Sequence, residues 1–238
     1  LGIGNAIADI LAKPDDAFLA DHAMTKGAMA LIDESRAAAI YQAMGPATEI
    51  SGGSAANTIA GLANFGARAA FVGKVRDDQL GGVFSHDIRA SHVAFETRPA
   101  FAGPATARCY VLVTPDGERT MNTYLGAAQD LSPADIDPAQ IAASSIVYLE
   151  GYLWDPQDAK EAFLKAAGIA HANGRRVALT LSDAFCVGRY RDEFLHLIRS
   201  GTVDIVFANA AELAALYQND DFDAALAQLR TDAALAVV

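Results

Sequence analysis

The sequence predicts an α/β fold in which helices cover both faces of a mostly parallel central sheet, with a small second sheet beside it. Apolar runs of strand length alternate with segments of helical spacing along most of the 238 residues. Continuous apolar strands separated by helices are typical of parallel sheets buried on both faces. One stretch breaks this pattern, because its residues alternate in the manner of an antiparallel hairpin. With 52% hydrophobic residues, the chain is long enough to bury a large core.

The strands and helices of the main sheet follow one another in a regular order. An extended segment at 48–51 leads into an amphipathic helix at 55–65, followed by a short apolar strand at 69–73 and a helix at 77–90. The alternation resumes at residue 145, and Asn173-Gly174 ends the first helix of that part. The further expected strands are 145–150, 176–181, 203–208 and 234–238, and the further expected helices are 156–173, 191–199, 210–217 and 222–230.

The hairpin region predicts the second sheet. Segments 106–114 and 118–124 alternate like two antiparallel strands, and Pro115-Asp116-Gly117 supplies the turn between them. Residues 28–32 are another extended candidate. Strands from about 24–32 and 106–124 would together form a small sheet that projects from the main domain. Small flaps of this kind often act as lids that exclude water from a reacting centre, although a plain edge hairpin explains the same pattern.

Charge and cysteine content narrow the class of protein. A net charge of −11 argues against a nucleic-acid partner, because phosphate backbones are bound by clustered Lys and Arg. No apolar run approaches the roughly 20 residues of a membrane-spanning helix, and the first residues have neither a charged leader nor a cleavage site. Cys109 and Cys186 are far apart, as expected for reduced thiols, although a disulfide between them stays open. We therefore expect a cytoplasmic enzyme that acts on a small molecule.

Several common catalytic motifs do not occur in the sequence. There is no Gly-x4-Gly-Lys-Ser/Thr loop, no His or Cys pair with zinc-ligand spacing, and no Gly-x-Ser-x-Gly elbow. These absences argue against a Walker-type nucleotide hydrolase, a zinc protein and a serine hydrolase of that type.

The segment from Gly2 to Asp9 begins like a dinucleotide-binding fingerprint, but it lacks the third glycine and the helix that should follow. We interpret it as a strand end from which Asn5 and Asp9 project into a cleft. The Asp9 carboxylate can accept two hydrogen bonds from a vicinal diol, which is a common way to hold a sugar. A capping role for Asp9 at a turn is the alternative.

The stretch from Gly52 to Asn57 (Gly-Gly-Ser-Ala-Ala-Asn) stands where an extended segment turns into a helix. Gly52 and Gly53 allow a ligand to approach the backbone, because glycine has no Cβ and tolerates positive φ. Ser54 lies at the start of the helix, where free N–H groups can hold hydroxyl or anionic groups. Asn57 adds a donor and an acceptor on the first turn. A tight turn that packs the helix against the sheet is the alternative.

A second pair of polar residues follows the expected strand 203–208. Asn209 is a natural N-cap, and Glu212 stands at the spacing of a capping box. The functional alternative places this amide and carboxylate at the C-terminal edge of the sheet, where they could order a hydrated Mg²⁺ near phosphates.

Together these segments resemble the ribokinase-like (phosphofructokinase B) carbohydrate kinase family over essentially the whole chain. The first family signature corresponds to the Gly52–Asn57 stretch and its continuation through 60–66, and the family's Asn-x-x-Glu corresponds to Asn209 and Glu212. Within the family the likeness is greatest to adenosine kinases and their bacterial sugar-kinase relatives. Supporting stretches are 4–9, 73–78, 116–120 and 181–185.

The resemblance implies phosphoryl transfer from ATP to a hydroxymethyl group, which is the 5′-hydroxyl if the acceptor is adenosine. It implies that Asp9 holds the ribose diol, that Gly53 and Asn57 contact the same sugar together with Gly52 and Ser54, and that Asn5 lies beside it.

For the phosphates, the resemblance implies that Arg119 neutralises charge in the transition state. Asn209 and Glu212 would organise Mg²⁺ and its waters, with Glu212 acting through water. Tyr152 and Phe185 could flank a base by stacking, although core packing explains both residues equally well.

The sequence departs from the family pattern in two places. The family's second signature, Asp-Thr-x-Gly-Ala-Gly-Asp, does not occur in the 238 residues. It would supply the anion hole and the Asp that takes the acceptor's proton. The final apolar residues at 234–238 begin a buried strand with nothing after it to cover it, so we expect an incomplete chain that does not catalyse the reaction by itself. Arg76 replaces a residue that is usually Gly in close relatives.

These observations favour the substrate-binding and lid-bearing part of an adenosine-kinase-like enzyme that uses ATP and Mg²⁺ as a monomer or homodimer. A sugar kinase of the ribose or fructose type is one alternative. A non-catalytic module that binds a small molecule is the other.

Overall fold

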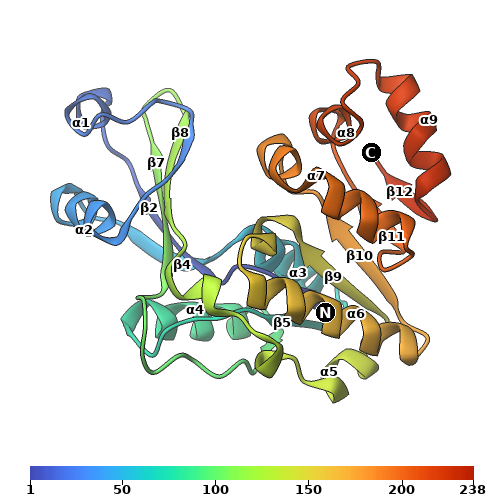
Figure 1. Ribbon diagram of the computed structural model, residues 1–238. Helices are drawn as coiled ribbons and strands as arrows, with labels where there is room; N and C mark the ends of the chain where they lie inside the picture. The colour runs from blue at the N-terminus through green and yellow to red at the C-terminus, as the bar shows by residue number, and fades with distance from the viewer. The chain divides into compact units, whose positions relative to one another are not determined.

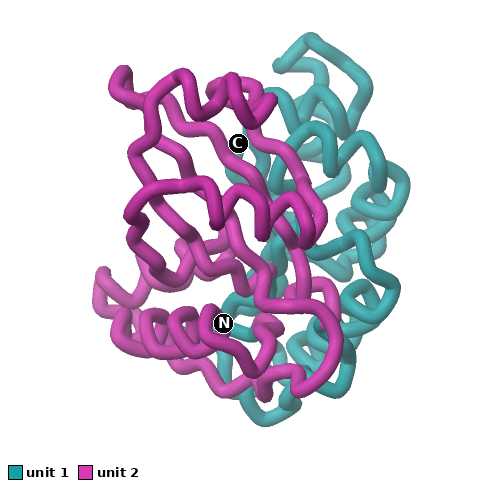
Figure 2. Tube along the Cα trace, turned by 90° about the vertical axis from the view of Figure 1, so that its left-hand side faces the viewer, with its two compact units in different colours: residues 1–4, 69–72, 131–238 teal, residues 5–68, 73–130 magenta.

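The computed structural model describes all 238 residues and divides into two compact units (Figure 2). Unit 1 comprises residues 1–4, 69–72 and 131–238, and unit 2 comprises residues 5–68 and 73–130. No helix of the chain has both the length and the apolar character needed to cross a membrane.

Unit 1 is built on a parallel sheet (Figure 1). Its strands lie in the order β12-β11-β10-β9-β1-β5, and every neighbouring pair among them is parallel. The α/β fold class expected from the sequence is thereby confirmed. The strands are β1 (Gly2–Ile3), β5 (Ala69–Val72), β9 (Ile146–Glu150), β10 (Arg176–Thr180), β11 (Ile205–Phe207) and β12 (Leu235–Val237).

Four of the five helices of unit 1 begin after an Asp or Asn whose side chain caps the helix. The predicted helix at 191–199 is the second half of a longer helix, α7, whose N-cap Asp183 accepts a hydrogen bond from the Cys186 N–H at 2.6 Å. A non-helical Tyr190 (φ −123°, ψ 24°) kinks α7, which is why the helical spacing could be followed only from residue 191. The helices are α5 (Pro138–Ala143), α6 (Gln157–Ala172), α7 (Ala184–Arg199), α8 (Ala210–Tyr217) and α9 (Phe222–Asp232), with short 3-10 turns at Pro133–Asp135 and Gly151–Trp154.

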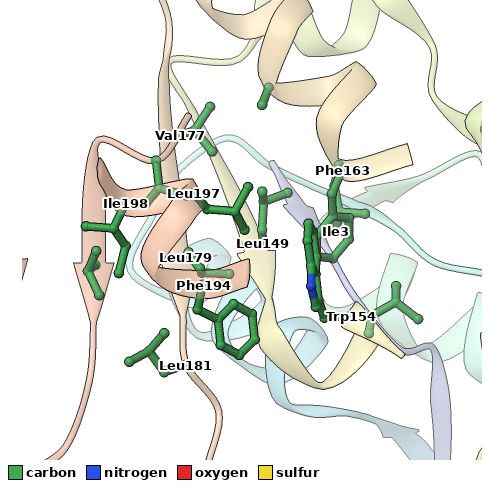
Figure 3. Packing of buried hydrophobic residues seen from close by; sticks show 14 of the residues in the cluster. Ile3, Leu149, Trp154, Phe163, Val177, Leu179, Leu181, Phe194, Leu197 and Ile198 are labelled. Carbon is green, nitrogen blue, oxygen red and sulfur yellow. The ribbon is translucent and has the colours of Figure 1, made fainter. Parts of the chain in front are cut away.

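Side chains from the sheet and from α6 and α7 form the core of unit 1 (Figure 3). Trp154 stands between two other rings, with its centroid 5.9 Å from that of Phe163 and 6.1 Å from that of Phe194. Tilted ring pairs at such distances add to the stabilisation from burial alone. Its indole N–H also donates to Glu193 at 2.8 Å, so the polar atom of this large side chain is satisfied.

Unit 2 contains a five-stranded sheet in the order β3-β8-β7-β2-β4. The expected hairpin is present as the antiparallel pair β7 (Ala107–Val113) and β8 (Arg119–Tyr124), and β3 (Met29–Leu31) pairs with β8. The sequence analysis had not predicted the central strand β2 (Ile7–Ala12), which lies between β7 and β4 (Thr48–Gly52). Asp9 therefore lies inside a strand and not at a strand end.

One face of this sheet is covered by helices, as Figure 1 shows for α1 and α2. Tyr110 of β7 is fully buried there and its hydroxyl donates to the carbonyl of Ala37 at 2.7 Å. On this helix-covered face, side chains of β2 and β7 pack against those of α1 and α2. The buried residues of this cluster are Ile10, Ala12, Leu19, Ala37, Ile40, Tyr110 and Leu112. Because side chains alternate along a strand, the opposite face, here called the Asp9 face, carries Asp9, Leu11, Ile50, Cys109, Val111, Val113, Arg119, Met121 and Thr123.

The helices of unit 2 complete its framework. Two of them, α1 and α2, were not predicted from the sequence; each begins after an aspartate, Asp15 or Asp33, whose side chain accepts from an N–H three residues later. They are α1 (Asp16–Asp21), α2 (Glu34–Ala43), α3 (Ser54–Asn64) and α4 (Gln79–Ala90), with strand β6 (Val93–Phe95) and a 3-10 turn at Gly126–Asp130.

Candidate active site

A row of cross-strand neighbours places Asp9 at the centre of the Asp9 face. In the sheet register Asp9 pairs with Ile50 of β4 on one side and with Cys109 of β7 on the other, and Cys109 pairs with Thr123 of β8. Paired residues point to the same face, with Cβ atoms about 4.5–5.5 Å apart. One row across the sheet, here called the Asp9 row, therefore consists of Ile50, Asp9, Cys109 and Thr123. The neighbours of the Asp9 carboxylate in this row are apolar or weakly polar.

The Asp9 carboxylate lies against the backbone of Gly52. A Cβ at position 52 would come within 2.2 Å of Asp9 Cγ and 2.3 Å of its Oδ2, so no other residue fits there without moving the carboxylate. Burial raises the pKa of Asp9 from 3.8 to about 6. No hydrogen bond or ion pair within the protein offsets this loss of solvation. The carboxylate is therefore suited to accept hydrogen bonds from a ligand.

Gly53 makes the turn from β4 into α3 possible. Its φ of 98° lies in the region that favours glycine, and a Cβ there would come within 2.4 Å of the Asn5 carbonyl oxygen. The backbones of Asn5 and Gly53 are thus in close approach. Ser54 and Asn57 are exposed on the first turn of α3, directly after this contact. The structure places Asp9 against Gly52 and Asn5 against Gly53, and this glycine pair leads directly to Ser54 and Asn57. That these six residues bind a substrate stays a prediction.

Helix α4 fixes the strand that ends in Gly52. The backbone N–H and the hydroxyl of Ser51 both donate to the same oxygen of Asp87, each at 2.7 Å. Hydrogen bonds to a charged acceptor are stronger than neutral ones, so Asp87 anchors β4 one residue before the contact with Asp9. No pattern in the sequence predicts this pair, since 36 residues separate its members.

Arg119 is on the Asp9 face but not beside Asp9. It pairs with Val113, and a row containing Val111 and Met121 lies between it and the Asp9 row. Four residues along a strand span about 13 Å. Its side chain is exposed. The structure therefore separates Arg119 from the carboxylate along the strand direction.

Cys109 is a candidate contact that the sequence analysis did not single out. It lies next to Asp9 in the register and its sulfur accepts a hydrogen bond from the Thr123 hydroxyl at 3.2 Å. Burial raises its pKa to about 11, so the thiol is protonated near neutral pH. The alternation of residues 106–114 could have placed Cys109 on one face, but only the pairing with β2 shows that Asp9 shares that face. Both cysteines of the chain are free thiols.

In unit 1, Tyr152 and Phe185 differ in their surroundings. Tyr152 is half-buried and packs against the core, and burial together with the nearby Asp183 raises the pKa of its hydroxyl. Phe185 is 69% exposed, and the Arg189 guanidinium lies 4.8 Å from the centre of its ring. Core packing therefore explains why an aromatic side chain stands at Tyr152, but it does not explain the exposed ring of Phe185. Between them, Ser182 has a φ of 74°, which is uncommon for a residue with a side chain.

Asn209 and Glu212 form the capping box at the start of α8. The Glu212 N–H donates to Asn209 Oδ1 at 2.9 Å, while the Asn209 N–H and side-chain amide donate to the two carboxylate oxygens at 3.1 and 2.7 Å. Glu212 is only 4% exposed, and burial raises its pKa. The capping interpretation is confirmed.

The chemistry of Asn209 and Glu212 also decides whether this pair fits Mg²⁺. No group of three or more His, Cys, Asp or Glu residues in the chain is placed to hold a metal ion, but Mg²⁺ keeps several waters and needs only one or two carboxylates. Each Glu212 oxygen has lone pairs beyond the bond that it accepts from Asn209. A buried carboxylate without a cation partner therefore fits contact with Mg²⁺ through water.

Arg76, the departure noted in the sequence, has a structural role in unit 2. Its guanidinium donates to the carbonyl of Gly103 at 3.1 Å, and its backbone N–H donates to the Thr106 hydroxyl at 3.0 Å. It thus ties the loop before β7 to the start of α4.

Comparison with known proteins identifies the family. Residues 31–238 match the profile of the pfkB family carbohydrate kinases. The chain belongs to this family. The resemblance inferred from the Gly52–Asn57 stretch and from Asn209 and Glu212 is therefore confirmed, and the pfkB fold agrees with the parallel sheet and the small second sheet.

Two solved structures are similar over 99% of this chain. One, described as an adenosine kinase from Sinorhizobium meliloti, is 59% identical with a TM-score of 0.90, and the match covers 72% of its length. The other, described as a probable sugar kinase protein from Rhizobium etli CFN 42, is 55% identical with a TM-score of 0.91, and the match covers 71%.

A curated relative is similar over a shorter part of this chain than the two solved structures are. The ATP-dependent ribose-1-phosphate kinase of Halopiger xanaduensis is 32% identical over 178 residues, which are 72% of this chain and 56% of that protein. The pfkB chain thus spans about half the length of this relative.

Proposed function

We propose that this pfkB chain is the acceptor-binding part of a kinase that transfers the γ-phosphoryl group of ATP to the 5′-hydroxyl of a nucleoside, with adenosine as the first candidate. The observation that carries the proposal is the Asp9 carboxylate, which is pressed against Gly52 and has no partner within the protein. A vicinal diol would supply two donors to its oxygens.

The groups around Asp9 support a ribose acceptor. Gly52 and Gly53 let a sugar approach the backbone, and Ser54 and Asn57 are exposed on the first turn of α3. In the proposed complex Asn57 exchanges hydrogen bonds with the sugar hydroxyls, and the backbone at Asn5 borders the same sugar. These roles follow the family resemblance, and the contacts among Asn5, Asp9 and the two glycines support them.

The apolar neighbours of Asp9 favour a nucleoside over a free sugar. Leu11, Ile50, Cys109 and Val111 surround the carboxylate on its own face of the sheet. A nucleobase has two apolar faces that such a surface would cover, whereas a free sugar carries a hydroxyl group on most of its carbons and offers less apolar area. The exposed ring of Phe185 is a further candidate for stacking on the base, and the family resemblance assigns Tyr152 the same role. The neighbour described as an adenosine kinase supports the same choice.

In the proposed reaction the acceptor oxygen forms a bond to the γ-phosphorus while the bond to ADP breaks, and the hydroxyl proton passes to a base. Arg119 would neutralise phosphate charge. Its distance from the Asp9 row is compatible with this role, because the 5′-hydroxyl lies at the end of the ribose away from the diol. We assign strands 24–32 and 106–124 the role of a lid. Asn209 and Glu212 would hold Mg²⁺ through water, and the bound ion would offset the charge of the ATP phosphates.

A binding panel tests the acceptor assignment. Thermal-shift and calorimetric titrations of adenosine, inosine, ribose and fructose compare the chain with its Asp9→Asn variant, because a ligand that binds the native state raises its stability. We expect adenosine to bind most tightly and Asp9→Asn to weaken it at least tenfold. The matched control is Asp116→Asn, an exposed carboxylate of the same unit that pairs with Lys26. Equal adenosine affinity in Asp9→Asn would overturn the acceptor assignment.

The two alternative functions, a sugar kinase and a non-catalytic binding module, predict other results. A sugar kinase, favoured by the similarity to the probable sugar kinase protein and the ribose-1-phosphate kinase, would bind ribose or fructose in preference to adenosine. A non-catalytic module would bind its ligand without ATP-dependent turnover in the full-length gene product. The proposed cytoplasmic location rests on two buried free thiols. Sedimentation would decide between monomer and homodimer.

A further inference from the structure

A cavity lies on the helix-covered face of the five-stranded sheet. Its volume is about 240 Å³, well above what a single water molecule needs. Strands β2, β4 and β7 supply one wall, and α2 and the start of α4 supply the other. The side chains that matter are Tyr41, Glu49, Gln79, Arg108 and Tyr110. All belong to unit 2 and none was given a role in the proposed kinase reaction.

Arg108 lines this cavity, and one nitrogen of its guanidinium group has no partner. Its Nε is buried and has no hydrogen-bond acceptor among the atoms of the protein. The guanidinium lies 5.3 Å from the centre of the Tyr124 ring, and no carboxylate forms an ion pair with it. A buried charged donor without an acceptor is more unfavourable than a neutral one. A carboxylate in the cavity would offset the unpaired positive charge of this guanidinium.

The opposite charge is available on the same wall. Glu49 receives a single hydrogen bond, from the Tyr41 hydroxyl at a long 3.3 Å. Asp78, which also lines the cavity, is already engaged, because it accepts from the Gly81 N–H at 2.8 Å and from the Thr106 N–H and hydroxyl at 2.9 and 2.6 Å. Glu49 is thus the carboxylate that remains free to accept from an occupant.

The start of α4 reinforces the preference for an oxygen acceptor near Arg108. Gln79 and Leu80 are the first two residues of this 12-residue helix, and both line the cavity. The N–H groups of a first turn have no partner within their own helix and carry the positive end of its dipole.

We propose that this cavity binds a small zwitterion, with its carboxylate at Arg108 and its ammonium group at Glu49, which is the charge pattern of a free α-amino acid. A simple anion would meet Arg108 but would also face the Glu49 and Asp78 carboxylates. A simple cation would meet Glu49 but would lie in a cavity that also holds the guanidinium. Only a ligand with both charges satisfies both groups.

The cavity is distinct from the candidate acceptor site. Ile10, Glu49 and Arg108 line it, and they alternate along their strands with Asp9, Ile50 and Cys109, which point to the opposite face. The two sites are therefore on opposite sides of the same three strands. The proposal does not depend on the kinase assignment, since its test measures binding alone.

Isothermal titration of the 238-residue chain with glycine, L-alanine and L-serine tests the proposal, and acetate and methylammonium represent the two halves of the ligand. We expect at least one amino acid to bind at least tenfold more tightly than either half. Arg108→Gln and Glu49→Gln should each weaken it at least tenfold. Arg98→Gln and Glu96→Gln make the same charge changes at exposed positions of unit 2 and should leave it unchanged.

Three results would overturn the proposal: no binding of any of the amino acids, binding unchanged in both cavity variants, or acetate binding as tightly as the best amino acid. The last would identify a site for simple anions. Should Arg108→Gln fail to fold, as circular dichroism would show, the partly exposed Glu49 still carries the test.

Discussion

The carboxylate of Asp9 and the backbone of Gly52 occupy adjoining space so closely that a single added methyl group at position 52 would overlap Asp9 Cγ at 2.2 Å. This contact joins β2 to β4, and the paired glycines lead from it directly into α3. Because Gly52 has no side chain, this pfkB chain has room for the Asp9 carboxylate, the proposed diol-binding group, directly against the β4 backbone.

Replacing Gly52 by alanine should displace the Asp9 carboxylate. We expect Gly52→Ala to weaken acceptor binding at least tenfold and to destabilise the fold by about 1–3 kcal/mol, the usual effect of overpacking. Calorimetric titration and urea unfolding measure the two effects. Gly61→Ala is the control, because a Cβ at this position in α3 meets nothing within 4 Å and alanine favours a helix over glycine. Unaltered acceptor affinity in Gly52→Ala would contradict the role of this contact.

Protonation of Asp9 should make both stability and binding depend on pH. Because burial raises the pKa of the folded state from 3.8 to about 6, the folded protein binds the proton more tightly than the unfolded chain. The contribution of Asp9 to the stability of the wild type therefore falls by at most about 3 kcal/mol as the pH rises from about 4 to 6, and it is level above that range. Binding of a diol to the ionised carboxylate should increase over the same interval.

Unfolding of Asp9→Asn at several pH values tests this linkage. The variant should gain stability over the wild type above pH 6 and lose that gain near pH 4. Asp116→Asn should show the reverse trend, because Lys26 lowers the pKa of Asp116 to about 2 and the contribution of this pair is lost as the pH falls toward that value. A difference between Asp9→Asn and wild type that does not vary with pH would refute the raised pKa.

Loss of the Asp87 anchor should loosen the end of β4. Asp87→Ala removes the acceptor of two hydrogen bonds from Ser51, so we expect a destabilisation of about 1–3 kcal/mol. Acceptor affinity should fall by a smaller factor than in Gly52→Ala, because Asp87 acts through the position of the strand. His86→Ala, at an exposed position of α4, provides the comparison. Hydrogen exchange of the Ser51 N–H measures the loosening directly.

Substitutions in the capping box of α8 distinguish its role in stability from a role in metal binding. Asn209→Ala should destabilise the fold by about 0.5–2 kcal/mol, the range for loss of an N-cap, whereas Asn209→Ser should restore most of it. Glu212→Gln keeps one carbonyl oxygen for the box but loses the charge. In the full-length gene product it should raise the Mg²⁺ concentration needed for half-maximal activity at least fivefold. An unchanged Mg²⁺ requirement would limit Glu212 to capping.

The local signals in the sequence were reliable where neighbours along the chain determine the structure. The bounds of α8 were predicted as 210–217 because Asn209 caps a helix that its own next residues continue. The hairpin β7–β8 was predicted because its turn residues stand between its strands. By contrast, α1 and α2 are short or alanine-rich helices whose apolar face is weak in the sequence, and they are held by packing on β2 and β7.

The sequence by itself determined the alternation of strands and helices, the glycine pair at the start of α3 and the polar residues Asn209 and Glu212. Only the tertiary structure decided that β2 is a central strand, that Cys109 lies beside Asp9 and that Arg119 is two rows away. The physical reason is that the register of β2 depends on β7, 100 residues distant along the chain, and a slip by one residue moves every side chain to the other face. Which residues surround the carboxylate is therefore a property of the pairing, although the carboxylate itself could be found from the sequence.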